Sequence, residues 1–468
     1  METTPNSAPS AIVIGGSMAG LWAGRVLADH FERVTIIERD HFPETPEVRK
    51  GVPQAHHLHL LLARGHQILD QLFPGLTAEL DGFGAGIIDL SQDAAFLLRS
   101  GWTPRFRSGI LSYASSRYLL EWGVQRRLAA HPRVHFMEGA EVVGLLSDQS
   151  RSRVTGVRMR YRPGASQPGE ETLAADLVVD ASGRSTGAPE WLEALGYARP
   201  QETVVNSFLA YATRWYRRPA NFPAQWRLLF INGRPPDVPR GGAIFAVEGD
   251  HWVVTLGGAA RDYPPTDEAG FMAFARSLPS PLLYQAIKDA EPVSPIYGYQ
   301  RTTNQLRHFE RLARWPQNFV VTGDAACAFN PIYGQGMSVA AMGALALDEC
   351  LREGRGPGMA QRFQKRLAKV SEGAWLLATG EDFRYPTTEG GQRTWMTRFS
   401  HWYIDQVLQA LPDSTEITRA FMEVSQLLKP PAALFHPRIV GIALRHALNR
   451  SGKPAAQDYP LPAGWRTD

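Results

Sequence analysis

The sequence predicts an α/β protein in three parts: a domain built on a parallel sheet, a domain built on a mixed β-sheet, and a C-terminal helical region. Three observations predict this. An apolar run at residues 11–14, a glycine-containing turn, a helix-like stretch and a second apolar run at 34–37 follow one another, which is the order of a βαβ unit. Beyond residue 201 the pattern changes to long strands rich in aromatic residues. From about residue 398 the chain is amphipathic and helical.

Composition excludes several classes of protein. A chain of 468 residues is long enough for more than one domain. The net charge is only +3 and no long basic run occurs, which argues against nucleic acid as the main partner. Two cysteines are too few for a disulfide framework, residues 1–10 lack an apolar signal core, and no run of about 18 apolar residues occurs. We therefore expect a cytoplasmic protein with no transmembrane segment and an unknown oligomeric state.

The βαβ unit carries a glycine fingerprint. Gly15 allows the chain to turn sharply after the first strand, and Gly20 lets the helix approach the sheet closely. The N–H groups at residues 17–20 then face a pyrophosphate, while Glu38, at the end of the second strand, accepts hydrogen bonds from ribose hydroxyls. Ser17 stands where a second glycine is usual, so the pyrophosphate must clear its Cβ or bind its hydroxyl. We predict dinucleotide binding; an ordinary βαβ crossover is the alternative.

Two further segments lie close to this unit in the sequence. Residues 50–59 contain His56, His57 and His59, but no carboxylate is spaced to complete a metal site, so we expect these histidines to shape a loop near the nucleotide. Arg117 lies in the first turn of a helix that Ser115 or Ser116 could cap. A cation there opposes the helix dipole unless it meets a phosphate, so a solvated arginine is the alternative.

The middle of the chain is predicted to be rich in β-structure. Residues 134–136 and 141–146 are expected to continue the first sheet, and residues 206–257 to form an antiparallel sheet that covers the substrate. Residues 267–289 are expected to be helical. The aromatic residues that we expect to contact a substrate are Phe208, Tyr211, Trp226 and Phe245.

A second strong signal comes late in the chain. Asp324 directly follows a buried strand at residues 318–322, and a segment from Asn330 to Met337 with two glycines opens a long helix. Asp324 can bind hydroxyls of a ribityl chain, and the N–H groups of residues 334–337 can stabilise negative charge on a reduced ring. A purely structural helix start is the alternative, although it would not need so much glycine.

Together these motifs resemble the single-component (group A) FAD-dependent monooxygenases of the para-hydroxybenzoate hydroxylase type. The resemblance covers residues 11–351 and rests on the fingerprint with Glu38, the turn at residues 180–184, and the segment from Gly323 to Met337. Within that group the chain looks most like the polyene epoxidases of polyether pathways, which share the stretches 49–54 and 329–334.

The resemblance implies an α/β fold with a Rossmann-like FAD-binding domain, a mixed-sheet substrate domain and a C-terminal helical region. It implies that NAD(P)H reduces the FAD and that O2 then forms a C4a-hydroperoxide, which transfers one oxygen atom to a lipophilic alkene or aromatic substrate by epoxidation or hydroxylation. No catalytic residue is certain; Tyr113, His56 and Tyr297 are candidate bases for a phenolic substrate. The implied cofactor-binding residues are Gly15, Ser17, Met18, Ala19, Gly20, Glu38, Arg39, Arg117, Val143, Gly183, Asp324, Pro331, Gly334, Gly336 and Met337.

We expect the domain boundaries to follow the motifs. The FAD-binding domain would comprise residues 1–82, 108–198 and 296–372, the substrate-binding domain 83–107 and 199–295, and the helical region 373–468. That last region matches none of the motifs: it could close the pocket, bind a partner or make peripheral contact with a membrane.

Other functions use the same cofactor cradle. An FAD-dependent reductase or dehydrogenase like the geranylgeranyl reductases is the main alternative, and a flavoprotein that binds a ligand without turnover is another. A flavin-dependent halogenase usually carries a Trp-x-Trp-x-Ile-Pro segment, which this chain lacks.

Overall fold

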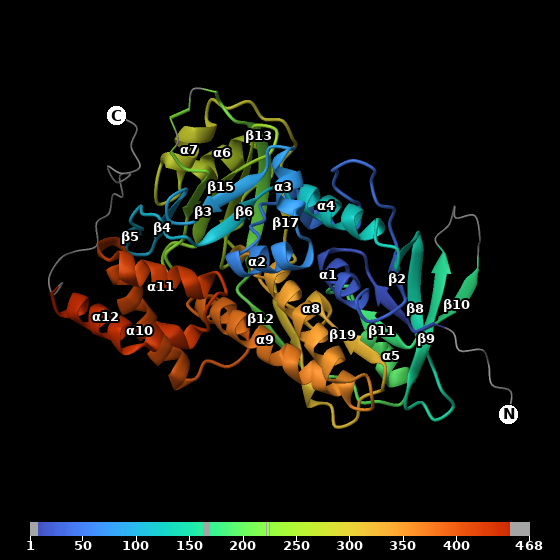
Figure 1. Ribbon diagram of the computed structural model, residues 1–468. Coiled ribbons are helices and arrows are strands. Elements are labelled where there is room, and N and C mark those ends of the chain that lie inside the picture. Colours follow the sequence, from blue (N-terminus) through green and yellow to red (C-terminus); the bar gives the residue numbers. More distant parts are fainter. Residues whose placement is uncertain (1–7, 162–168, 221, 224, 450–468) are drawn as a thin grey trace.

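The computed structural model describes residues 8–161, 169–220, 222–223 and 225–449 (Figure 1). Its first sheet has five parallel strands in the order β19-β11-β1-β2-β7. The strands are β1 (Ser10–Ile14), β2 (Arg33–Glu38), β7 (Val134–Glu138), β11 (Leu177–Asp180) and β19 (Phe319–Val321). The α/β prediction with a parallel sheet, a mixed sheet and C-terminal helices is confirmed.

The βαβ unit forms where the sequence predicts it. Helix α1 (Met18–Leu27) connects β1 to β2, and the inward-facing residues of all three elements are buried in one apolar core. Helices α4 (Arg117–Ala129) and α8 (Gly336–Glu353) pack against α1, and α2 (Ala63–Leu72) packs against α8. Helix α1 therefore contacts two helices, α4 and α8, from segments far apart in the sequence.

Residues 141–146 do not continue the parallel sheet as expected. They belong to β8 (Ala140–Ser147), which forms a separate antiparallel sheet with β9 (Val154–Tyr161) and β10 (Glu170–Ala174), at the right of Figure 1. Gly139, with φ +69°, turns the chain after β7, and the pairing of β8 with β9 shifts register between Val142 and Gly144. The sharp turn directs β8 away from the first sheet.

A seven-stranded mixed sheet forms the second large layer, in the order β17-β13-β16-β15-β14-β4-β5. Its strands are β4 (Ala94–Leu98), β5 (Gly101–Trp102), β13 (Ala210–Arg217), β14 (Leu228–Ile231), β15 (Arg240–Val247), β16 (His251–Gly258) and β17 (Tyr297–Tyr299). Helices α6 (Glu268–Arg276) and α7 (Leu282–Ile287) pack on one face. The helical segment expected at 267–289 is thus two helices, because residues 277–281, ending at Pro281, interrupt it.

Short elements connect these layers. Strands β12 (Glu202–Asn206), β18 (Asn304–Arg307), β20 (Cys327–Ala328) and β21 (Glu389–Gly390) make a four-stranded sheet, and β3 (Gly86–Asp89) pairs with β6 (Leu111–Ala114). The remaining helices of this part are α3 (Leu76–Asp81) and α5 (Ala188–Ala194), with 3-10 turns at Pro53–His56, Phe309–Arg311, Gly323–Ala325 and Pro331–Tyr333.

The C-terminal region consists of α9 (Met359–Asp382), α10 (Trp395–Ala410), α11 (Thr415–Ser425) and α12 (Pro437–Asn449), with 3-10 turns at Leu411–Asp413 and Pro431–Phe435. Helices α10 to α12 enclose a small apolar core of their own at the lower left of Figure 1. Leu98 packs against that core, and Arg99 pairs with Asp405, so the region is fixed to β4 and β5. Among the described residues, no helix has both the length and the hydrophobicity to cross a bilayer.

Candidate functional site

A cavity of about 1360 Å³ lies between the parallel sheet, the mixed sheet and the C-terminal helices. The starts of α1 and α8, the end of β2 and the segment from Lys50 to Leu62 form one part of its wall. Strands β4, β12, β13, β14, β15 and β16, and residues of α9, α10 and α11, also line it. All the expected cofactor-binding residues line this cavity except Gly20 and Val143.

Those two exceptions have clear structural causes. A Cβ at Gly20 would lie 1.8 Å from the carbonyl oxygen of Gly15, so Gly20 serves the contact between α1 and β1 rather than the cavity. Val142 lines the cavity and Val143 does not, because neighbouring side chains of a strand point to opposite faces.

The turn before α1 is built on Gly15. Its φ is +99°, and a Cβ there would lie 2.7 Å from the carbonyl oxygen of Ala181 at the neighbouring strand end. Because the first N–H groups of a helix have no intrahelical partners, those of Met18 and Ala19 remain available at the cavity wall. The start of α1 is therefore suited to bind an anion.

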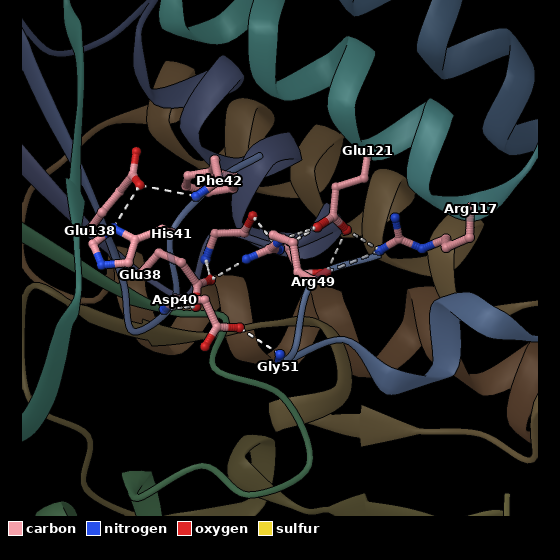
Figure 2. Close-up of polar contacts among 11 residues, drawn as sticks. Glu38, Asp40, His41, Phe42, Arg49, Gly51, Arg117, Glu121 and Glu138 are labelled. Carbon is pink, nitrogen blue, oxygen red and sulfur yellow. Dashed lines mark hydrogen bonds and ion pairs between the residues drawn. The ribbon is translucent and has the colours of Figure 1, made fainter. Parts of the chain in front are cut away.

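A buried ionic network lies directly beside this helix start (Figure 2). Glu121 receives hydrogen bonds from Arg49 Nε at 2.9 Å and from the hydroxyl of Ser17 at 2.9 Å, and it pairs with Arg117 at 2.5 Å. Arg49 also lies 3.4 Å from Glu38. Although burial disfavours the charged carboxylate, Arg117 and Arg49 hold the pKa of Glu121 below its ordinary value. The two guanidinium groups therefore stabilise the charged form of the Glu121 carboxylate.

This network changes the expected roles of three residues. The hydroxyl of Ser17 faces Glu121 and accepts from Arg117 Nη2 at 3.0 Å, so it does not point freely at a phosphate. Arg117 shares its charge with Glu121, although its Nη1 is buried without a hydrogen-bond partner. The carboxylate of Glu38 accepts from the backbone N–H groups of Gly16 at 2.7 Å and Asp40 at 3.1 Å.

Asp324 also lines the cavity, in a short turn after β19. Gly323 has φ +61°, and a Cβ there would lie 2.6 Å from Cβ of Ala19, so the turn touches α1. Arg184 Nε lies 3.8 Å from Asp324 Oδ2. Burial raises the pKa of the Asp324 carboxyl, and Arg184 opposes that effect.

The segment before α8 is held by amide and carboxylate groups. Asn330 accepts a hydrogen bond from the hydroxyl of Tyr211 at 3.1 Å and donates one to Asp382 at 3.1 Å. Asn304 also donates to Asp382, at 2.6 Å. Gly334 follows with φ +64°. These bonds fix the position at which α8 begins, and burial raises the pKa of Asp382 to about 6.

Of the aromatic residues expected at the substrate, only Tyr211 lines the cavity. Trp226 packs with Trp252 on the face of the sheet that α6 and α7 cover. Phe245 is fully buried in a third cluster, and Phe208 lies against the guanidinium of Arg261, at 3.4 Å. Strand alternation could not distinguish these faces, because both faces of the sheet are apolar. The apolar wall is instead made by Phe96, Leu98, Leu228, Phe230 and Ile231.

The candidate bases also lie away from the cavity. The hydroxyl of Tyr113 donates to the carbonyl of Thr77 and to Asp81, each at 2.9 Å. His56 stacks on Tyr297, with ring centroids 3.9 Å apart. Neither side chain of that stacked pair, nor Tyr113, lines the cavity.

The comparisons with known proteins now bear on this arrangement. No family model matches the chain. Protein Rv3254 of Mycobacterium tuberculosis is 33% identical over 456 residues, which cover 95% of this chain and 94% of the mycobacterial protein.

The chain belongs to the same family as Rv3254.

Solved structures show which fold this member of the Rv3254 family has. The flavin-dependent brominase Bmp2 aligns with a TM-score of 0.67 at 14% identity, covering 94% of this chain and 98% of the brominase. A flavoprotein/dehydrogenase from Cytophaga hutchinsonii gives a TM-score of 0.67 at 14% identity, with 94% and 99% covered. PqsL, a probable FAD-dependent monooxygenase from Pseudomonas aeruginosa, gives 0.56 at 16% identity, with 89% and 99% covered. The fold is therefore that of flavin-dependent halogenases and monooxygenases.

The sequence analysis did not identify several residues that the structure of this Rv3254 relative places at the site. Asp382 and Asn304 join the site from segments with no motif, and no sequence signal identifies them. Glu121 could have been found, because it lies four residues after Arg117 on one helix face. His57 and His59 line the cavity, but neither lies in a group of three metal-binding side chains within the described ranges. Burial and the charge of Arg117 lower the pKa of His59 to about 3.

Proposed function

We propose that this protein is an FAD-dependent monooxygenase that inserts one oxygen atom from O2 into a lipophilic alkene or aromatic substrate, with NAD(P)H as reductant. The observation that supports the proposal is one continuous cavity. It joins a helix start suited to a pyrophosphate, a carboxylate suited to a ribityl chain, and an apolar space beside the mixed sheet.

The residues present fit FAD. The N–H groups at Met18 and Ala19 would face the pyrophosphate, and Arg117, which lines the same cavity, would add a positive charge near it. Asp324 would accept from ribityl hydroxyls. The start of α8, where Gly334, Gly336 and Met337 line the cavity, would meet the ring. All these residues lie at the cavity wall.

Bound FAD would supply the activation of O2, and the protein's own residues would supply position and dryness. Phe96, Leu98 and Phe230 would keep water from the reacting atoms. The hydrogen bonds from Asn330 to Asp382 and from Tyr211 to Asn330 would hold the start of α8 in place. Transfer to an alkene, as in epoxidation, needs no general base, which is consistent with the absence of a titratable triad among the side chains described above.

The test is a visible spectrum of the purified protein, followed by NADH and NADPH oxidation with polyenes, terpenoids and phenols, with and without bromide. We expect a bound flavin, and a product heavier by one oxygen atom. A brominated product would indicate a halogenase. Reduction of the substrate without oxygen consumption would indicate a reductase of the geranylgeranyl reductase type.

We also propose that the C-terminal helices contact an anionic lipid surface. Trp395, Met396, Phe399 and Trp402 are exposed on α10, and the side chain of Trp395 is 74% exposed. Arg398, within this aromatic patch, is exposed and has no acidic partner among the described residues. Met396 also lines the cavity, so the patch adjoins an opening through which a lipophilic substrate could enter.

Vesicle sedimentation tests this second proposal. Vesicles with phosphatidylglycerol should retain the protein and vesicles of phosphatidylcholine alone should retain less, because Arg398 favours the anionic surface. Replacing Trp395 and Phe399 by Ser should abolish retention. Equal recovery of the wild-type protein and this variant with the vesicles would contradict the proposal.

A further inference from the structure

A chain of hydroxyl groups ends at His57, on the wall of the cavity. The backbone N–H of Leu58 donates to Thr255 Oγ1 at 3.3 Å. Thr255 Oγ1 lies 2.7 Å from Thr213 Oγ1, which in turn lies 2.8 Å from Nδ1 of His57. Thr213 and Thr255 face each other in paired strands β13 and β16, so the sheet fixes the positions of both hydroxyls.

The protons of this chain can be arranged in two directions. If Thr255 donates to Thr213 and Thr213 donates to Nδ1 of His57, Nδ1 is the acceptor and the ring proton lies on Nε2. If Nδ1 donates to Thr213 and Thr213 donates to Thr255, the ring proton lies on Nδ1, and the Thr255 hydroxyl donates into the cavity that Thr255 also lines. The first direction keeps both hydroxyl protons in hydrogen bonds within the protein, and the Thr213 variants below test it.

The ring is neutral, because burial, together with the neighbouring His56, lowers the pKa of His57 to about 4. It therefore carries one N–H group; when Nδ1 accepts from Thr213, that group is at Nε2. That atom has no hydrogen-bond partner among the described residues, yet it is not one of the fully enclosed unpartnered atoms. Since the ring lines the cavity, Nε2 is open to it.

The surroundings of this donor are mostly apolar. The ring of Tyr299 lies 5.2 Å from that of His57, and the ring of Tyr211 lies 6.5 Å away. Leu58 and Leu60 line the adjoining wall. Tyr211 bonds Asn330, so His57 lies close to the segment that opens α8. A donor in such a place selects a ligand that brings an acceptor.

We propose that His57 determines substrate specificity by donating a hydrogen bond from Nε2 to an oxygen atom of the substrate, which is then a lipophilic molecule that carries a carbonyl, ether or hydroxyl group. The proposal rests on the proposed function, because it assigns this group to the substrate of the same cavity. Thr213 is a positioning residue that holds the ring in the required tautomer.

The test uses 1-tetralone and tetralin, two molecules of the same skeleton that differ by one carbonyl oxygen. Each is titrated into the flavin-loaded enzyme, and binding is measured from the change in the flavin spectrum. The wild-type enzyme should prefer the ketone, and His57→Leu should reduce that preference by about threefold to tenfold, the effect of one neutral hydrogen bond. His57→Gln, which keeps an N–H donor, should restore part of it.

Two further variants separate this role from a structural one. Thr213→Val should weaken the ketone preference and Thr213→Ser should keep it, because only serine retains the hydroxyl. His56→Leu is the matched control: this neighbouring histidine stacks on Tyr297 outside the cavity, so the preference should not change.

An equal ratio of the two affinities in the wild-type enzyme and His57→Leu would overturn the proposal. So would a loss of flavin affinity in His57→Leu with the ketone preference intact, because His57 would then serve the cofactor. Flavin content is measured first in every variant. A wild-type protein that binds no flavin would refute the proposed function itself, which is a different result from either of these.

Discussion

At the scale of single residues, the site is set by which polar groups the protein satisfies internally and which it leaves for a ligand. Ser17 and Glu38 are engaged by Glu121, Gly16 and Asp40. Asp324 instead faces the cavity, with the Arg184 guanidinium 3.8 Å away. Asp324 should therefore contribute more to cofactor affinity than the fingerprint residues do.

Replacing Asp324 by Ala should weaken FAD binding. A charge-assisted hydrogen bond contributes about 1.5–3 kcal/mol, so the dissociation constant should rise at least tenfold. Fluorescence titration of the apoprotein with FAD measures it. Asp289→Ala is the control, because that carboxylate is exposed in a surface ion pair. Wild-type FAD affinity in Asp324→Ala would show that this carboxylate is not in the cofactor site.

The buried carboxyl group of Asp382 should make the free energy of unfolding depend on pH. Its folded-state pKa is raised to about 6 by burial, above the ordinary value of 3.8. The folded protein therefore holds this proton more tightly than the unfolded chain does, and the stabilisation is fully present below the unfolded pKa of 3.8 and is lost as pH rises through about 6. From this group, the free energy of unfolding should fall by up to about 3 kcal/mol between a pH well below 3.8 and a pH well above 6. Urea unfolding at several pH values measures it, and Asp382→Asn should lack this component.

Part of the residue-level picture could be predicted from the sequence. The cap at Ser116 and most of the cradle follow from local patterns, since a glycine or a cap acts on its own neighbours. The partners Asp382, Asn304 and Thr213 could not be predicted, because they reach the site only through tertiary packing. We expected Trp226 and Phe245 to contact a substrate, but neither residue lines the cavity. Both faces of the sheet are apolar, so the sequence does not show which face points toward the cavity.

At the scale of elements, α1 and the start of α8 are positioned by close backbone contacts. Gly20 packs its Cα on the carbonyl of Gly15, and Gly323 touches Ala19. The sequence predicts these elements to within two or three residues, because an apolar run with glycine at its end is a local signal. It did not predict that β8 leaves the sheet, because the turn at Gly139 is set by one backbone conformation.

Gly20→Ala tests the packing of α1. The new methyl group would lie 1.8 Å from the Gly15 carbonyl, so the helix must shift. We expect a loss of about 1–3 kcal/mol in the free energy of unfolding and weaker FAD binding. Gly441→Ala, in α12, meets no atom within 4 Å and should be neutral or stabilising. Similar urea midpoints for Gly20→Ala and the wild-type protein would refute this account of the fingerprint.

At the scale of the whole molecule, the cavity joins elements from the two sheets and the C-terminal helices, and the motifs of the sequence lie on one part of its wall. The C-terminal helices α9, α10 and α11 also line the cavity, and because they carry no motif, this role could not be assigned from the sequence. The fold was predictable because βαβ order and strand patterns are local, whereas the shape of the enclosed space depends on all the layers at once.

The most direct test of the account is oxygen-isotope incorporation. The flavin-loaded enzyme is supplied with NAD(P)H, ¹⁸O₂ and a lipophilic substrate identified by the oxidation screen, and the product is examined by mass spectrometry. The account predicts one ¹⁸O atom in each product molecule and none when the label is supplied as water. A product that carries oxygen from water, or that gains hydrogen or halogen and no oxygen, would contradict it.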